Sequence, residues 1–388
     1  MNTKKFMLFA SLFVIIVLIV GFSACERVSQ IVQPTTPQMT ETSDEISIGV
    51  VLPLTGRFTD SFGIPISQGF DLALSEINAA HPSGTKLTFI IKDSLSTVEG
   101  AIEAFNKLIH QDGVSVILGP ATSSQTEMAF PIAQENQVVA ISPTSAATGL
   151  SAIGDFVFRV ALTTDILIPR GVEVTQTKLG YQRAATMYDE TDLFSTDGDA
   201  SVREVLAAKE VEVITTEIFQ GGDTDFSEQL TRIQALDPDV IFVSCLSPEK
   251  PGILMQGHEL GISAPFIVRT LTATDVQAAG AAAEGAITFV GWGAALDTPG
   301  NQAFMENYNA KFDMEPSNYA ARAHATLHIL AEAIANAHST DSAAIRDALA
   351  SIRDFDTILG KFSFDANGDA VYDEKVLIVK DGKLVRFE

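Results

Sequence analysis

The chain has 388 residues, of which 46% are hydrophobic, enough for one large core or two ordinary domains. Its 25 basic and 49 acidic side chains give a net charge of −24 at pH 7. A surface of that sign repels phosphate backbones, which argues against nucleic acid as a partner. An acidic surface is typical of a soluble secreted protein.

The N-terminus has the pattern of a secretory signal. Lys4 and Lys5 precede the apolar run FMLFASLFVIIVLIVGF, and the small residues Ser23 and Ala24 come directly before Cys25. A basic start, an apolar middle and small residues before a cleavage point are typical of signal peptides. The run is slightly shorter than the ~20 residues of a membrane-spanning helix, so an uncleaved anchor is the second interpretation. Either way, the rest of the chain is expected outside the cytoplasm, attached to a membrane.

The sequence FSAC resembles the lipobox of bacterial lipoproteins, which implies that Cys25 becomes a lipidated N-terminus. Residues 1–25 are therefore interpreted as a lipoprotein signal peptide. Residues 26–44 lack apolar periodicity and are interpreted as a flexible tether. With Cys25 lipidated, Cys245 has no partner for an intrachain disulfide, and its apolar neighbours predict a buried thiol.

From residue 46 onward, strand and helix patterns alternate. The runs ISIGVVL, KLTFIIK, VSVIL and VVAIS have the composition of buried strands, and helical patterns separate them. A second series starts near residue 163 and ends with AITFV at 286–290. This alternation predicts mostly parallel sheets covered on both faces, and two series of similar size predict two α/β lobes. The segment KFSFDANGDAVYDEKVLIVK is expected to form a closing hairpin.

A cluster of hydroxyl side chains follows the run VSVIL, in the sequence GPATSSQT. A serine nucleophile would need a base in a recognisable arrangement, and G-x-S-x-G and S-x-x-K are both absent, so no enzyme is predicted. The P-loop motif is also absent. Two interpretations remain: Ser123 and its neighbours cap a helix, or they bind a carboxylate at its N-terminus. A second hydroxyl loop, Pro143-Thr144-Ser145, follows the next strand, so both loops could converge on one anion.

Four stretches of the chain carry a family resemblance: IGVVLPLTGRFTDSFGIPISQGFDLALSEIN, ILGPATSSQTEMAFPIAQENQVVAISPTSA, DTDFSEQLTRIQALDPDVIFV and FMENYNAKFDMEPSNYAARAH. In their order and spacing they resemble type I periplasmic binding proteins of the leucine/isoleucine/valine-binding family. The resemblance implies two Rossmann-like α/β lobes with parallel sheets, joined by a three-segment hinge. It implies lobe one at 45–161 plus 291–358, and lobe two at 162–290 plus 359–388.

The resemblance also implies a ligand site between the lobes. In that family, a serine at the position of Ser123 holds the ligand carboxylate, and an aromatic residue at the position of Phe62 packs on the ligand. The residues expected to bind ligand are Phe62, Thr122, Ser123, Thr144, Ser145, Ala146, Phe194, Ser247, Thr270, Asp275 and His324.

The sequence departs from the family at two of these positions. Relatives often have threonine where this chain has Ala146, and Ser145 is expected to substitute for it. Relatives that bind aliphatic amino acids have a glutamate for the ligand ammonium where this chain has Arg269, Thr270 and Leu271. Either Asp275 pairs with the ammonium, or the ligand is not an ordinary α-amino acid. Arg269 would suit an additional acid group, or it is a surface residue.

Two further patterns are weighed against metal binding. His324 and His328 have the i, i+4 spacing of helical metal ligands, but no third ligand is evident, which favours helix packing. Asp365, Asn367 and Asp369 resemble a calcium loop, but a glycine occupies the fourth position where the sixth is required, which favours a hairpin turn. No metal or cofactor is predicted.

Taken together, these features predict an extracytoplasmic, lipid-anchored solute-binding protein of an ABC importer, with a permease as partner. The expected ligand is a small carboxylate, and the resemblance to the branched-chain type family implies an amino acid. Alternatives are a ligand-sensing module that signals through a membrane partner, and a binder of a non-amino-acid acid or amide.

Overall fold

The computed structural model describes residues 45–80 and 86–388, which belong to a compact unit that begins at Ser43. The predicted signal peptide, the tether and Cys25 lie outside the described residues. Among the described helices, none combines the length and the apolar composition needed to cross a membrane.

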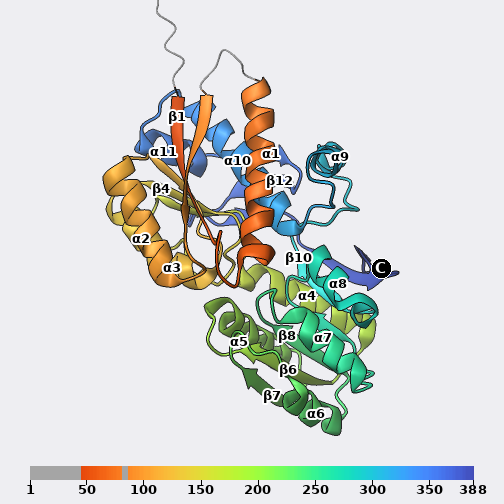
Figure 1. The fold of residues 1–388 in the computed structure, drawn as a ribbon. Helices are drawn as coiled ribbons and strands as arrows, with labels where there is room; N and C mark the ends of the chain where they lie inside the picture. Colours follow the sequence, from red (N-terminus) through yellow and green to blue (C-terminus); the bar gives the residue numbers. More distant parts are fainter. Residues whose placement is uncertain (1–44, 81–85) are drawn as a thin grey trace, which may run out of the picture. The chain divides into compact units, whose positions relative to one another are not determined.

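The first sheet has five parallel strands, and its helices come from two separate parts of the chain, residues 64–135 and 301–350 (Figure 1). In sheet order the strands are β2 (Lys86–Asp93), β1 (Glu45–Leu52), β3 (Val116–Leu118), β4 (Val139–Ser142) and β5 (Val157–Arg159). The associated helices are α1 (Ile64–Ala80), α2 (Val98–Lys107), α3 (Ser123–Glu135), α9 (Asn301–Phe312), α10 (Asn318–Ala337) and α11 (Ser342–Ala350). Short π-helical turns η1 (Thr59–Gly63) and η2 (Leu108–Asp112) adjoin α1 and α2.

Alternate residues of these strands pack against opposite helical layers. Val116 and Leu118 of β3 belong to the same apolar cluster as residues of α1 and α10. Ile117 between them belongs to a second cluster with residues of α2 and α3. The sheet is therefore buried on both faces, which explains why its strands read as continuous apolar runs.

The second sheet is mixed. In order, its strands are β15 (Lys383–Arg386), β14 (Lys375–Lys380), β10 (Ile287–Val290), β9 (Phe266–Val268), β8 (Val240–Ser244), β6 (Arg183–Asp189) and β7 (Glu212–Phe219). Strands β6 to β10 are parallel, whereas β14 runs antiparallel to β10 and β15. Its helices are α4 (Thr164–Leu179), α5 (Leu193–Ala208), α6 (Ser227–Leu236), α7 (Lys250–Glu259), α8 (Ala273–Ala279) and the 3-10 turn η3 (Gly280–Ala283). The predicted α/β class is confirmed, with one parallel sheet and one mixed sheet in which β6 to β10 are parallel.

The C-terminal segment differs from the expected closing hairpin. Strand β12 (Gly360–Phe364) pairs with β11 (Phe355–Thr357) and β13 (Ala370–Val371) in a separate small sheet. Strand β14 instead pairs with β10 and β15. The chain passes between these sheets beside Tyr372, whose buried hydroxyl donates to the carbonyl of Val160.

The predicted turn at Asp365 is confirmed. Its carboxylate accepts the backbone N–H of Asn367 at 2.8 Å and that of Asp369 at 2.9 Å. Asp369 in turn accepts a hydrogen bond from Nε of the buried Arg159 at 2.7 Å.

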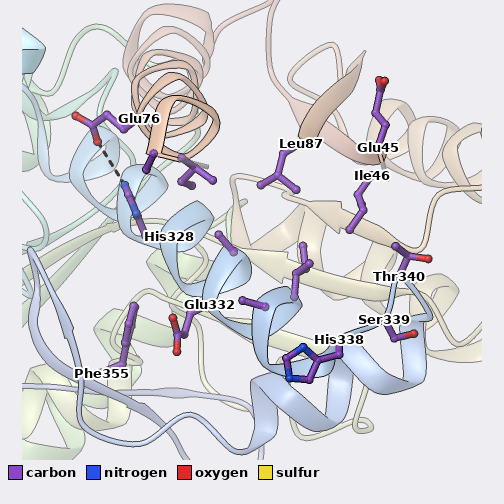
Figure 2. A pocket seen from close by; sticks show the side chains of 15 residues that line it. Glu45, Ile46, Glu76, Leu87, His328, Glu332, His338, Ser339, Thr340 and Phe355 are labelled. Atoms are coloured by element: carbon purple, nitrogen blue, oxygen red, sulfur yellow. Dashed lines mark hydrogen bonds and ion pairs between the residues drawn. The ribbon is translucent and has the colours of Figure 1, made fainter. Parts of the chain in front are cut away.

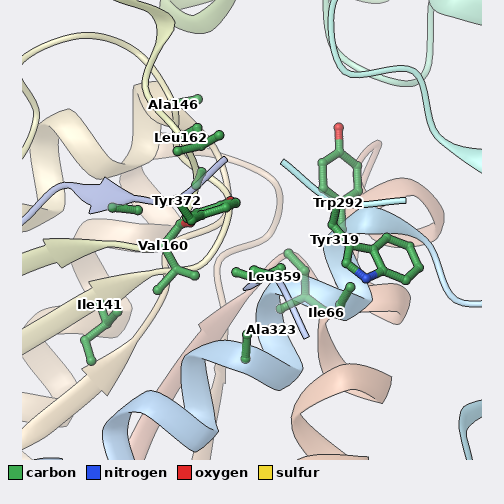
Figure 3. Packing of buried hydrophobic residues seen from close by; sticks show 14 of the residues in the cluster. Ile66, Ile141, Ala146, Val160, Leu162, Trp292, Tyr319, Ala323, Leu359 and Tyr372 are labelled. Atoms are coloured by element: carbon green, nitrogen blue, oxygen red, sulfur yellow. The ribbon is translucent and has the colours of Figure 1, made fainter. Parts of the chain in front are cut away.

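One large apolar cluster includes residues of both main sheets. Figure 3 shows part of it, with Leu162, Trp292, Leu359 and Tyr372 from the segments that connect the sheets. Tyr319 of α10 belongs to the same cluster and is labelled beside Trp292 in this view. The connecting segments are thus packed against the element that carries part of the candidate site.

Candidate functional site

The hydroxyl cluster marks the start of helix α3. Thr122 has extended backbone angles, and its Oγ1 accepts the N–H of Gln125 at 3.4 Å, so it is the N-cap of α3. Gly119 precedes it with φ +116°, and a Cβ at this position would lie 2.3 Å from the carbonyl oxygen of Val51. Only glycine lets strand β3 pass so close to β1 before the chain turns into the helix.

Ser123, the first residue of α3, joins the two hydroxyl loops. Its Oγ accepts the backbone N–H groups of Ala146 and Ala147, each at 3.2 Å. Two accepted bonds use both lone pairs of the hydroxyl oxygen, which leaves its O–H as a donor. The predicted convergence of the two loops is present at Ser123.

Thr144 and Ser145 have different roles in the second loop. Thr144 lines a cavity with Ser123, and its hydroxyl donates to the carbonyl of Ala121 at 2.5 Å. The Ser145 hydroxyl lies in a buried network, 2.8 Å from Oγ of Ser142 and 2.5 Å from Oγ1 of Thr126. The structure therefore does not bring Ser145 to the cavity, and the expected substitution for the missing threonine is not made there.

The cavity lies at the carboxyl ends of strands from both main sheets, and little space remains inside it. Its volume is about 10 Å³, room for roughly one water molecule, so an amino acid fits only if side chains or whole loops move. Its lining is formed by Phe62, Ala121, Thr122, Ser123, Thr144, Ala146, Phe194, Leu246, Thr270, Tyr319 and Arg322.

Aromatic rings from three elements line the cavity. Phe62, in the π-helical turn η1, stacks on Tyr319 of α10 with ring centroids 4.5 Å apart. Phe194 lies in the first turn of α5, and the guanidinium of Arg269 covers its ring at 3.6 Å from the centroid. Arg269 also donates to the carbonyl of Phe194 and to the hydroxyl of Thr164. Arg269 is therefore buried and braces Phe194, and the surface interpretation of this arginine is wrong.

Arg322 is the cation that lines the cavity. It is 5% exposed, and its Nε donates to the carbonyl of Asn318 at 3.3 Å. Within residues 45–80 and 86–388, no carboxylate pairs with it and its Nη2 has no hydrogen-bond partner. Burial lowers the pKa of the Arg322 guanidinium from its usual value, though an arginine stays charged at neutral pH. A buried, unpaired cation beside the α3 N-terminus favours an anionic ligand.

Asp275, by contrast, already has partners outside the cavity lining. Its Oδ2 accepts the N–H of Thr272 at 2.8 Å and the hydroxyl of Ser247 at 3.3 Å. The buried ammonium of Lys250 lies 3.9 Å from the same oxygen and donates to the carbonyl of Thr270 at 2.8 Å. Burial raises the pKa of Asp275, and Lys250 opposes that shift. Thr270 lines the cavity, whereas Ser247 and Asp275 lie behind it.

His324 lies outside this cavity as well. Its Nε2 is 2.7 Å from Oε2 of Glu76 on α1, and it contributes to a different cavity with Phe304 and His328. The position expected for a ligand contact from α10 is taken by Tyr319 and Arg322. Burial lowers the pKa of His324 from its usual value, which favours the neutral ring.

Polar contacts connect loops of the first sheet with loops of the second. Nη2 of Arg57, after β1, donates to Oε1 of the buried Glu249, before α7, at 2.5 Å. The Ser124 hydroxyl donates to Oδ1 of Asp192 at 2.9 Å. Burial raises the pKa of the Asp192 carboxyl, and hydrogen bonds from Ser195 and Ser124 oppose that shift. Segments that follow strands of the first sheet are thus hydrogen-bonded to segments that follow strands of the second sheet, near the cavity.

Sequence reasoning missed four lining residues, Ala121, Leu246, Tyr319 and Arg322. Tyr319 stands in the quoted motif PSNYAARAH, and Arg322 follows it by three positions, which is one face of a helix. A spacing of three residues places both side chains on the same face of the helix, so the sequence contained a signal for both. Leu246 carries no signal beyond its place at the end of a strand.

Comparison with known proteins identifies the family. The model of the family described as periplasmic binding protein matches residues 45–383. The Leu/Ile/Val-binding protein BraC3 of Rhizobium johnstonii is 26% identical, over 84% of this chain and 89% of that protein.

Solved structures of similar proteins have the same fold. The leucine-binding protein LivK of Thermotoga maritima superposes with a TM-score of 0.82 at 25% identity, over 88% of this chain and 98% of that one. The branched-chain amino acid transporter substrate-binding protein LivJ of Streptococcus pneumoniae, in complex with isoleucine, gives a TM-score of 0.82 at 28% identity, with the same coverage. The chain belongs to the periplasmic binding protein family.

Proposed function

We propose that this protein is the solute-binding component of an ABC importer and binds a small carboxylate ligand, an amino acid in the first instance. The observation that carries the proposal is Ser123 at the N-terminus of α3. Its hydroxyl oxygen is saturated by two backbone N–H groups, and its O–H is left to donate into the cavity. Helix N-termini carry about half a positive charge, so a carboxylate is the favoured guest.

The similar proteins support an aliphatic amino acid as the first ligand class to test. LivK is described as a leucine-binding protein, and LivJ holds isoleucine. In this chain, Phe62, Phe194 and Leu246 would contact an aliphatic side chain. Ala146, where relatives often have threonine, removes one polar contact.

We further propose that two lobes close on the ligand, with lobe one at 45–161 plus 291–358 and lobe two at 162–290 plus 359–388. The ion pair between Arg57 and Glu249 and the contact between Ser124 and Asp192 belong to the closed arrangement, in which the cavity is narrow. Ligand entry then requires an open state in which these contacts are broken. The ligand stabilises closure by its differential affinity for the two states.

Calorimetry with the L-amino acids tests the ligand class. We expect a 1:1 complex with at least one aliphatic member. Absence of binding to every amino acid, by protein that has first been unfolded and refolded to release any copurified molecule, would refute the amino-acid proposal.

A second candidate ligand is an acid that lacks a free ammonium group or carries an additional acid group. Asp275 is already held by Thr272 and Lys250, so no free carboxylate in the described cavity lining faces an ammonium. Arg322 is a buried cation without a carboxylate partner among the described residues. Both observations favour anionic over zwitterionic ligands.

Comparing leucine with 4-methylpentanoate, its deaminated analogue, separates the two candidates. Tighter binding of leucine supports the amino-acid proposal and requires an acceptor for the ammonium. Tighter binding of 4-methylpentanoate supports the second candidate.

We also propose that the protein is extracytoplasmic and anchored through a lipid on Cys25, with an ABC permease as its membrane partner. The support is the N-terminal sequence together with the family. Mass spectrometry of the N-terminal peptide from membrane fractions tests the anchor, because lipidation at Cys25 adds acyl chains that a Cys25→Ser variant cannot carry.

A further inference from the structure

We propose that Glu76, His324 and His328 form a binding site for a divalent transition metal ion, with Zn²⁺ as the best match. The three side chains offer one carboxylate oxygen and two ring nitrogens, all within 4.8 Å of one another. The site lies between α1 and α10, separate from the ligand cavity of the proposed function. Glu76 is the third ligand that was not evident beside His324 and His328 in the sequence.

The local structure explains why the three groups converge. His324 and His328 are one turn apart on α10, so their rings lie on the same side of the helix, with centroids 4.5 Å apart. Glu76 belongs to α1, which packs closely on α10. Both rings turn Nε2 toward the same oxygen, Oε2 of Glu76, at 2.7 Å for His324 and 3.4 Å for His328.

These distances are close to those of a metal site. With bonds of about 2.0–2.2 Å at tetrahedral angles, two ligand atoms of Zn²⁺ lie about 3.3 Å apart. The distance from Oε2 of Glu76 to Nε2 of His328, 3.4 Å, is already close to this value. The distance from the same oxygen to Nε2 of His324, 2.7 Å, must lengthen by about 0.6 Å. The metal takes the place of the proton that now lies between Nε2 of His324 and Oε2 of Glu76, and in the neutral ring that proton moves to Nδ1.

The surroundings leave room for an ion and for its remaining ligands. Glu76 and His328 border a cavity of about 350 Å³ shared with Phe304 and Asn307, and also one end of a larger open cavity shown in Figure 2. His328 and Glu76 have side chains 34% and 29% exposed, which provides a path of entry. Asn307 donates to Oε1 of Glu76 at 2.9 Å and thereby orients the carboxylate as an outer partner.

The ligand set selects the class of metal. Two imidazoles and one carboxylate suit Zn²⁺ and its neighbours in the first transition series, and they suit Mg²⁺ or Ca²⁺ poorly because those ions prefer oxygen ligands. Three protein ligands leave a fourth position for water. A bound ion would join α1 to α10 at positions two and six residues after Arg322, and so would stiffen the helix that carries the cavity residues Tyr319 and Arg322.

The test uses untagged protein freed of metal with EDTA, titrated with ZnCl₂ and followed by native mass spectrometry and thermal unfolding. We expect one bound Zn²⁺ per chain and a higher Tm with zinc than without it, because an ion that binds only the folded state stabilises it. Co²⁺ in place of Zn²⁺ should give the visible absorption of a four-coordinate complex. His328→Ala and Glu76→Gln should each weaken binding by at least about tenfold, since even outer partners contribute about 10- to 100-fold.

The matched control is His338→Asn. His338 borders the same large cavity but is not part of the cluster, and asparagine tolerates its left-handed backbone angle. Zinc binding should be unchanged in this variant. The proposal is refuted if the wild-type protein binds no zinc, or if both cluster variants, folded by their Tm, bind it as tightly as the wild type. Either result would mean that the three side chains form hydrogen bonds only.

Discussion

At the scale of single residues, Ser123 and Ser145 differ although the sequence predicts that both contact the ligand. Ser123 lines the cavity, whereas the Ser145 hydroxyl is hydrogen-bonded away from it. Ser123→Ala removes a donor at the cavity and the acceptor of two backbone N–H groups. We expect ligand affinity to fall by about 1–3 kcal/mol, or about 5- to 150-fold.

Ser145→Ala is the matched variant. Its hydroxyl bonds to Ser142 and Thr126 away from the cavity, so we expect a lower Tm with the affinity unchanged. Calorimetry and thermal unfolding of both variants provide the comparison. An affinity loss in Ser145→Ala that equals the loss in Ser123→Ala would contradict the assigned geometry.

Substitution of Arg322 is expected to affect the stability of the fold and the binding of ligand in opposite directions. Replacing a buried charge that has no ionic partner by an apolar side chain of similar length costs little and can stabilise the fold. We therefore expect Arg322→Met to keep or raise the Tm of the ligand-free protein and to weaken binding of an acid by at least about tenfold.

The control for this variant is Arg159→Met. Arg159 is equally buried, but it pairs with Asp369, which would be left without its cation. This variant should lose about 3–5 kcal/mol of stability. A sharp drop in Tm for Arg322→Met, or unchanged binding of every acid tested, would show that Arg322 is structural.

The sequence predicts a site residue when local structure fixes its position, and it fails when the position depends on the course of a loop or on tertiary packing. Thr122 and Ser123 follow from a strand end and a helix start, which are readable locally. Ser145 and Ala146 are neighbours, and which of them faces the cavity depends on the course of one loop. On α10, Tyr319 and Arg322 line the ligand cavity and His324 lines a different cavity. Which side of the helix faces the ligand cavity depends on tertiary packing, which the sequence of the helix does not show.

At the scale of elements, the packing of α1 on α10 is the contact that positions Phe62 against Tyr319. It depends on Gly69, where a Cβ would lie 2.2 Å from the carbonyl oxygen of Ala320. Gly69→Ala should therefore force the helices apart and cost about 1–3 kcal/mol in the free energy of unfolding.

Gly252→Ala on α7 is the control. The nearest atom to its added Cβ is a ring carbon of Phe226 at 3.2 Å, and the better helix propensity of alanine, about 1 kcal/mol, offsets that contact. Denaturant unfolding of the two variants tests the difference. Equal stability would mean that α1 and α10 do not need the close approach at Gly69.

Strands with a long apolar run were predicted from the sequence. Strands that form mainly because they pair with a neighbouring strand were not. The apolar runs of β1 to β4 are clear in the sequence, whereas β5 has only three residues and exists through its pairing with β4. Helix α5 starts at Leu193, earlier than its apolar pattern, because Asp192 caps it by accepting the N–H of Ser195. The partner of β14 is β10, far away in sequence, which no local pattern reveals.

At the scale of the whole molecule, the two proposed lobes meet through the ion pair of Arg57 and Glu249. If this pair belongs to the closed arrangement, Arg57→Ala should weaken ligand binding by up to about tenfold, because closure then leaves Glu249 buried without its cation. The effect is modest because Arg57 is itself 37% exposed.

Arg170→Ala changes the charge equally but removes ion pairs with Glu173 and Glu374, which lie in the same proposed lobe. We expect no change in affinity for that variant. Equal losses in the two variants would point to a general effect of charge and would count against closure through Arg57.

The proposed function requires that α3 binds the ligand carboxylate at its N-terminus, and the loss of that charge can be measured. The best ligand of the calorimetric panel is compared with its carboxamide, which keeps the shape and loses the negative charge. We predict that the carboxamide binds at least about tenfold more weakly to the wild-type protein, and that this difference shrinks in Ser123→Ala. Equal affinity of the acid and its carboxamide would mean that the N-terminus of α3 does not bind a carboxylate.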